Sequence, residues 1–222
     1  MLKAINATDL LRAAANCKVF YKKKAWMKTI LLVANRNQEV GWHGIVKRAE
    51  NNPAKFIVED ILVYPQEVTA TSITTDMVEY MNWQDSLDAD IFNSVRLQAH
   101  SHVNMGVMPS SVDMKYREDL LTDIDDFYIF QILNKTGYIS SQVYDIEAGI
   151  LYENDQVETV LESFDPLVYD ICVMLFNEWI NTHDLQNGVG WFASIADEFK
   201  EFMDRADSVI AEHNVSHFVK NL

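Results

Sequence analysis

Residues 95–113 constrain the fold of this chain more than any other stretch, because they join a strand pattern to a helix start through two histidines. Along residues 95–102 apolar and polar side chains alternate, which is typical of a β-strand that buries one face. His100 and His102 fall on the polar face, and side chains two residues apart on a strand lie about 6–7 Å from each other. Residues 111–121 show a helical pattern. The stretch is therefore predicted to run from a strand through a loop into a helix.

Four side chains in this stretch have the spacing of a metal site, namely His100, His102, Ser110 and Asp113. Two imidazoles and one carboxylate can supply three legs of a zinc site with a fourth position open, which is the layout of a catalytic zinc. Most His-x-His pairs hold no metal, however, and Ser110 with Asp113 also matches a helix capping box. The two interpretations are compatible, because a helix start holds an aspartate in a fixed direction. Since four specified residues at these spacings arise by chance in roughly one of several thousand such chains, the combination predicts a zinc site.

The charge of the chain is strongly negative and unevenly distributed. The net charge is −15 over 222 residues, yet residues 1–50 carry ten Lys and Arg against three Asp and Glu. Phosphate backbones repel an acidic chain, so we expect no nucleic-acid partner. The basic run at residues 18–24 is expected to be a solvated edge or the balance to an acidic segment, with contact to an acidic partner as the alternative.

Two cysteines, Cys17 and Cys172, lie far apart in the sequence. They exclude a thiolate zinc site built from two cysteine pairs and suggest a reducing compartment. The first residues lack the apolar region of a signal peptide, and no run reaches the about 18 apolar residues that a membrane span needs. We therefore expect a soluble cytoplasmic protein with no membrane partner.

Strand and helix patterns alternate over the first 150 residues. The apolar share of 49% is sufficient for a packed core. The expected strands are residues 27–34, 41–46, 56–64, 95–102, 127–133 and 138–144, and the expected helices are residues 7–16, 76–88 and 111–121. An irregular polar stretch is expected at residues 65–75. This alternation predicts an α/β or α+β domain.

The pattern changes near residues 153–156, and no convincing strand signal follows. A first helix is predicted from Asp165 onward, and its apolar residues recur at helical spacing, namely Leu167, Val168, Ile171, Cys172, Leu175 and Trp179. After a break at residues 187–190, the inward positions of a second helix are Phe192, Ile195, Phe199, Phe202, Ala206, Val209 and Ile210. We therefore predict one domain at residues 1–154 and an acidic two-helix extension at residues 155–222.

The spacing His-x-His-x7-Ser-x2-Asp resembles the metal-binding signature of the JAMM family of zinc metallopeptidases, the MPN+ or JAB domain family. That family places an essential glutamate upstream, near the start of a strand and followed by a glycine, and Glu39 with Gly41 matches this pattern. The resemblance covers roughly residues 27–150. Residues 57–66 and 132–137 are similar to the prokaryotic and phage-encoded branch.

The resemblance implies a cytidine-deaminase-like JAB/MPN fold, in which helices flank a central mixed sheet. It also implies a zinc ion held by His100, His102 and Asp113, with a fourth position open to water. Glu39 would take a proton from that water and pass it to the leaving amine. Ser110 would donate a hydrogen bond to the oxyanion that forms from the substrate carbonyl.

The implied activity is hydrolysis of a peptide or isopeptide bond in a bacterial or phage protein, with a ubiquitin-like protein as one candidate substrate. Residues 65–75 and 103–109 are expected to wall a peptide groove. A proline often follows the second histidine in eukaryotic members, and Val103 stands there instead. The alternative is an MPN-type scaffold that acts through its helical extension without turnover. A DNA-associated relative is disfavoured by the net charge.

Several residues near the motif have simpler interpretations. Without the motif, Glu39 would be an exposed glutamate at a strand edge, and His43 is expected to be a packed histidine rather than a partner of Glu39. Met105 and Met108 could line a substrate groove or fill a gap under the loop. A further pair, His213 and His217, has helical metal-ligand spacing but lacks the glutamate that accompanies it in zinc peptidases.

Overall fold

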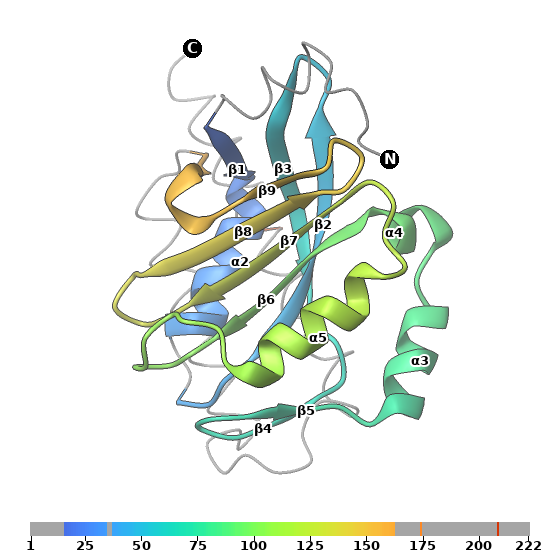
Figure 1. Ribbon diagram of the computed structural model, residues 1–222. Helices are drawn as coiled ribbons and strands as arrows, with labels where there is room; N and C mark the ends of the chain where they lie inside the picture. Colours follow the sequence, from blue (N-terminus) through green and yellow to red (C-terminus); the bar gives the residue numbers. More distant parts are fainter. Residues whose placement is uncertain (1–15, 35–36, 163–173, 175–207, 209–222) are drawn as a thin grey trace.

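The computed structural model describes residues 16–34 and 37–162, together with the single residues Met174 and Ser208. Within this part of the chain, eight strands form one mixed sheet, with helices on both faces and a separate two-stranded sheet at the bottom of the view (Figure 1). The expected mixed α+β class is therefore confirmed. The predicted helix at residues 7–16 and the two predicted C-terminal helices lie outside the described residues.

The large sheet places β6 in its interior. The strands are β1 (Cys17–Tyr21), β2 (Gly41–Ala49), β3 (Asn52–Leu62), β4 (Glu67–Val68), β5 (Ile73–Thr74), β6 (Val95–Ser101), β7 (Phe127–Leu133), β8 (Ile139–Asp145), β9 (Ile150–Tyr152) and β10 (Val157–Leu161). The helices are α2 (Lys23–Ala34), α3 (Met77–Asp85), α4 (Ala89–Ser94) and α5 (Ser111–Leu121), with a 3₁₀ turn at Asn154–Gln156. The order across the sheet is β10-β1-β3-β2-β6-β7-β8-β9. β6 therefore lies antiparallel to β2 on one side and parallel to β7 on the other.

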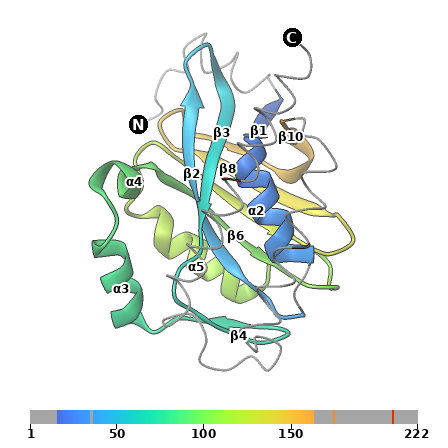
Figure 2. The ribbon, with the colours of Figure 1, turned by 180° about the vertical axis from the view of Figure 1, so that it is seen from behind.

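Each face of the sheet carries one long helix. Figure 2 shows α2 on the face opposite α5. The main apolar core lies under α2, where Trp42 of β2 and Leu97 and Ala99 of β6 are fully buried. A buried ion pair ties β2 to β8, because the guanidinium of Arg48 donates two hydrogen bonds to the carboxylate of Asp145, at 2.7 and 3.0 Å. No helix of the described chain has the length and apolar character that crossing a bilayer requires.

The apolar run after Lys23 forms a helix, so the prediction of a strand over residues 27–34 is wrong. Ala25, Thr29 and Leu32 are fully buried at helical spacing, and the Thr29 hydroxyl donates to the carbonyl of Ala25 one turn earlier. Few polar residues interrupt this run, so its helical period is hidden. A short apolar run of this kind cannot be told from a buried strand by its pattern.

The sheet continues past the predicted boundary at residue 154. β10 runs parallel to β1, with Cys17 opposite Val157 and Tyr21 opposite Leu161. The expectation that no strand follows residues 153–156 is therefore wrong. β10 is an edge strand with no fully buried side chain, so its sequence lacks the clear alternation of an interior strand.

The basic run at residues 18–24 balances an acidic segment, as one interpretation predicted. The ammonium groups of Lys18 and Lys22 lie 3.0 and 3.7 Å from the carboxylates of Glu158 and Glu162, respectively. The first pair joins β1 to β10. The second pair joins the residues that directly follow these two strands. The positive start of the chain and its negative later part are therefore partly neutralised across the sheet.

The remaining predicted elements of the described chain match the structure with small shifts, except in the segment before β6. The irregular stretch at residues 65–75 contains the short hairpin β4–β5. α3 is shorter than predicted and has no buried residue, so Met77 and Met81 face solvent. α4 was not predicted, because only six residues form it and propensity is weak over so short a window.

Candidate metal centre

β6 brings the two histidines to the face of the sheet that carries α5. His100 lies opposite Gly41 of β2 and Ile132 of β7, whereas its neighbours Ala99 and Ser101 point to the other face. His102 follows the strand, and its backbone N–H donates to the carbonyl of Leu133 at 2.8 Å. Both histidines are buried. Their backbone is therefore fixed by neighbouring strands rather than by a loop.

The first turn of α5 places the carboxylate. Ser110 is the N-cap residue, its hydroxyl accepts from the backbone N–H of Asp113 at 3.2 Å, and its own N–H donates to Asp113 Oδ2 at 2.6 Å. This is the predicted capping box. Burial alone would raise the pKa of Asp113, but the hydrogen bonds from Ser110 and the nearby His100 outweigh it and lower the pKa. The carboxylate is therefore held in the anionic form and in one direction.

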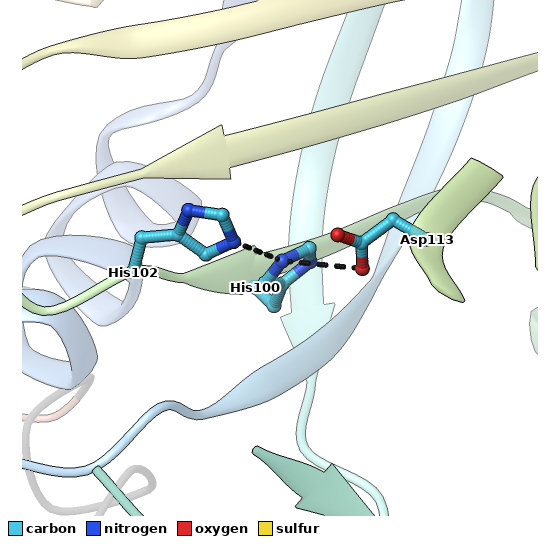
Figure 3. Close-up of side chains that lie close together, drawn as sticks. All are labelled: His100, His102 and Asp113. Carbon is cyan, nitrogen blue, oxygen red and sulfur yellow. Dashed lines mark hydrogen bonds and ion pairs between the residues drawn. The ribbon is translucent and has the colours of Figure 1, made fainter. Parts of the chain in front are cut away.

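The two histidines and the aspartate converge on one point (Figure 3). One ligand atom from each of His100, His102 and Asp113 lies within 4.8 Å of the others. The Nε2 atoms of the two histidines are 2.9 Å apart, and His100 Nε2 is 3.5 Å from Asp113 Oδ1. Ligand atoms of a tetrahedral zinc site are about 3.3–3.5 Å apart. The three residues could therefore hold a metal ion after the widest of these separations closes by about 1 Å.

The loop after β6 fixes which nitrogen of His102 faces the site. His102 Nδ1 lies 2.6 Å from the carbonyl oxygen of Gly106. A carbonyl only accepts, so Nδ1 carries a hydrogen, and Nε2 is the ring nitrogen that faces His100. Burial lowers the pKa of His100 to about 4, which keeps its imidazole neutral. His100 thus presents the neutral form that binds metals.

Glu39 lies beside this group without belonging to it. Its side chain is only 6% exposed, so the interpretation as an exposed edge glutamate is wrong. The pKa of Glu39 is raised, mainly by burial. The nearby His102 lowers this pKa and the nearby Asp113 raises it, so both residues lie close enough to Glu39 to act on its charge. Its backbone N–H donates to the carbonyl of Thr69 at 2.8 Å. Glu39 is therefore a buried carboxylate near His102 and Asp113, two of the three side chains that could hold a metal ion.

Two polar side chains that the sequence did not single out hold the backbone after Glu39. The hydroxyl of Ser101, between the two histidines, accepts from the N–H of Val40 at 3.0 Å. The Gln66 side chain accepts from the N–H of Gly41 at 2.7 Å and donates to its carbonyl at 2.8 Å. Only the position of Ser101 inside the motif could have indicated such a role. Nothing local indicated Gln66.

The glycine after Glu39 has a steric reason. A Cβ at Gly41 would lie 2.1 Å from the hydroxyl oxygen of Tyr64, which is buried. Any larger residue would displace Tyr64 or the strand. The second residue after Glu39 is therefore a glycine because the ring of Tyr64 occupies the space that a side chain would need.

His43 is packed, as expected, in an aromatic cluster farther along β2. Its ring lies among those of Tyr64, Tyr80 and Trp83, at centroid distances between 4.9 and 5.9 Å. Its Nε2 lies 2.8 Å from the hydroxyl of Tyr80. Burial lowers the pKa of His43 to about 4, so it is a neutral core histidine at pH 7.

The loop between β6 and α5 is open to solvent and tightly turned. Met108 is 79% exposed and Met105 is also exposed, so neither fills a gap under the loop. Val103 has a φ of 44°, a left-handed conformation that is rare for β-branched residues. His213 and His217 lie outside the described residues.

Arg117, one turn after Asp113 on α5, was not predicted. It is buried, its guanidinium carbon lies 5.0 Å from the centroid of Phe130, and Nη1 donates to Gln142 Oε1 at 2.5 Å. Its charge contributes to the lowered pKa of His100. Arg117 therefore brings positive charge to the α5 side of the site.

The assembled group consists of three converging side chains that could hold a metal ion, a nearby buried carboxylate and an exposed hydroxyl at a helix N-terminus. No protein-family model matches the chain, and no curated protein matches it. What the site can do therefore follows from its geometry and from the spacing of its residues.

Proposed function

We propose that this chain is a zinc metallopeptidase of the JAMM type that hydrolyses a peptide or isopeptide bond. The observation that carries the proposal is the convergence of His100, His102 and Asp113 with the buried Glu39 beside them. The motif spacing supports it, and so does a mixed sheet in which β6 delivers both histidines. The cytidine-deaminase-like JAB/MPN fold is part of the same proposal.

In this proposal His100, His102 and Asp113 hold zinc. Two neutral imidazoles and one carboxylate leave net positive charge at the centre. Zinc in such a site supplies a Lewis acid that polarises the scissile carbonyl and lowers the pKa of water toward about 7. The Gly106 carbonyl keeps His102 in the tautomer that this role needs.

Glu39 moves the proton. Because its pKa is raised, the carboxylate of Glu39 binds a proton more readily than an ordinary glutamate does. This suits a group that first accepts a proton from water and then returns it to the leaving amine. Ser110 is exposed at the N-cap of α5, and its hydroxyl oxygen accepts from the backbone N–H of Asp113. In this proposal its hydroxyl donates a hydrogen bond to the oxyanion.

The substrate in this proposal is a protein or peptide, and a ubiquitin-like protein is one candidate. Met105 and Met108 are exposed, and they would give one wall of the proposed substrate groove an adaptable apolar surface. A proline at position 103 could not adopt the φ of Val103, so this loop differs from that of members with His-Pro. Because of this loop, we expect the substrate preference of this chain to differ from that of members with His-Pro.

The decisive experiment separates metal binding from turnover with Glu39→Gln. The zinc-loaded wild type is incubated with native-host lysate, and new peptide termini are identified by mass spectrometry. Glu39→Gln should keep about one zinc per chain while cleavage falls by about 10²–10⁴-fold, because a general base is lost. Glu50→Gln, an exposed glutamate in the turn between β2 and β3, is the matched control and should cleave like wild type.

Other results would overturn the proposal. Full cleavage by Glu39→Gln would show that the assigned base is wrong. A zinc-loaded wild type that binds a host protein but produces no new termini would favour the scaffold alternative. A wild type that takes up no metal would remove the basis for both roles.

A further inference from the structure

α2 has two apolar stripes. Ala25, Thr29 and Leu32 point to the sheet and are fully buried. Trp26, Ile30 and Val33 are offset from them and form a second stripe at helical spacing. Trp26 and Val33 are 8% and 7% exposed, and Ile30 is partly buried against the same core. The second stripe is therefore nearly covered, and its three side chains line a cavity.

The second stripe forms one wall of a cavity of about 410 Å³. The other apolar walls come from Leu133 and Ile139 around the β7–β8 turn and from Leu161 of β10. Ligand pockets have volumes of about 300–1,000 Å³, so this cavity is large enough to take several side chains. Its apolar walls would give water few hydrogen-bond partners. The cavity lies on the sheet face opposite the metal centre, so hydrolysis does not explain it.

β10 leads the chain directly to this cavity. Tyr21, buried in the core under α2, lies opposite Leu161 in the β1–β10 register, so Leu161 points to the same face. One residue later, the N–H of Glu162 donates to the carbonyl of Tyr21 at 3.0 Å, and its carboxylate accepts from the N–H of Lys23 at 2.8 Å. The chain is thus anchored at the start of α2, and 60 residues follow it.

The sequence after this anchor fits the cavity in spacing and charge. Residues 165–179 carry an apolar stripe at helical spacing, and Met174, which lies off that stripe, is helical and exposed. Residues 163–222 carry ten Asp and Glu against three Lys and Arg. Lys135 lines the cavity, and its ammonium donates to Asn37 rather than to any carboxylate of the described chain.

We infer that residues 165–179 pack their apolar stripe into this cavity and complete the cover of α2. Only three residues separate Leu161 from residue 165, so the segment is held near the cavity at a local concentration that a separate partner does not reach. The extension is then a structural layer of the domain rather than a free arm. This inference does not depend on the proposed hydrolysis.

Leu161→Glu in the full chain tests the inference by hydrogen–deuterium exchange. A buried glutamate at this wall should release the segment, and amides of residues 165–179 should exchange at least about tenfold faster than in wild type. Leu151→Glu is the matched control, because both leucines are 41% exposed and lie on the two edge strands of the same sheet. It should leave that exchange unchanged.

A photo-crosslinking amino acid in place of the exposed Tyr138, which lines the cavity, gives a second measurement on an otherwise unaltered chain. The expected product is a cross-link within one chain to residues 165–179, with a yield independent of protein concentration. Equal exchange in both leucine variants, together with no such cross-link, would overturn the inference. A cross-link between two chains whose yield rises with concentration would also overturn it, in favour of a second copy.

Discussion

The two faces of β6 have different chemistry although they share seven residues. On the α2 side, Leu97 and Ala99 are fully buried in the main apolar core. On the α5 side, Gln98 and His100 project toward polar neighbours, and His100 joins His102 and Asp113. One strand therefore contributes to the free energy of unfolding through one face, and through the other it places side chains that could hold a metal ion.

This difference shows how a rigid site is supported. The face with the two histidines can hold polar groups because the opposite face buries apolar surface. Such burial stabilises the fold by about 25 cal/mol per Å². Ser101 connects the two, because it points away from the histidines and binds the backbone next to Glu39. The comparison predicts that substitutions on the two faces act on different measurable quantities.

The largest effect is expected from His102→Ala, which should abolish the metal-binding function of its face. Loss of an entire ligand should cost more than the about 10–100-fold in metal affinity that loss of a supporting hydrogen bond costs. The measurement is zinc titration against a chromophoric chelator, with Leu97→Ala as the control for the opposite face. An unchanged affinity in His102→Ala would show that the three side chains do not form the metal site.

Leu97→Ala should act on the other quantity. A fully buried leucine replaced by alanine is expected to lower the free energy of unfolding by about 2–5 kcal/mol, because a cavity is left in the core. Urea unfolding of the metal-free protein, followed by circular dichroism, measures this change. The folded variant should bind zinc with an affinity close to that of wild type. A large loss of affinity would show that the two faces are coupled.

The smallest expected effect concerns His43, which lies on the metal-binding face but is packed as a core residue. Its pKa falls from 6.5 to about 4 on burial, so the unfolded chain takes up the proton first as the pH falls. This contribution to stability is fully present above pH 6.5 and is lost between pH 6.5 and about 4, at about 1 kcal/mol per pH unit.

The pH effect is measured by comparing metal-free wild type with His43→Asn. The variant should show a shallower fall in the free energy of unfolding between pH 6.5 and 4, while the contribution of His100 remains in both proteins. Identical slopes would show that His43 is not a neutral buried group. They would also weaken the division of this face into a metal-binding part and a packed part.

The sequence indicated the ligand group because its determinants are local. Alternation along residues 95–102 places His100 and His102 on one face, and the capping box between Ser110 and Asp113 orients the carboxylate within four residues. By contrast, the pattern failed for α2 because Lys28 is the only charged residue between Met27 and Ala34, so this short apolar run shows little of its helical period. It failed for β10 because an edge strand needs little alternation.

Local periodicity thus determined that this chain places two histidines and an aspartate at the junction of a strand and a helix. Only the tertiary structure decided that Glu39 lies beside them, because that depends on the register between β2 and β6, whose residues are about 60 positions apart. The same holds for Gln66 at Gly41 and for the cavity against α2. Sequence patterns specify faces and caps within a few residues, whereas the pairing of distant strands is selected by the free energy of the whole core.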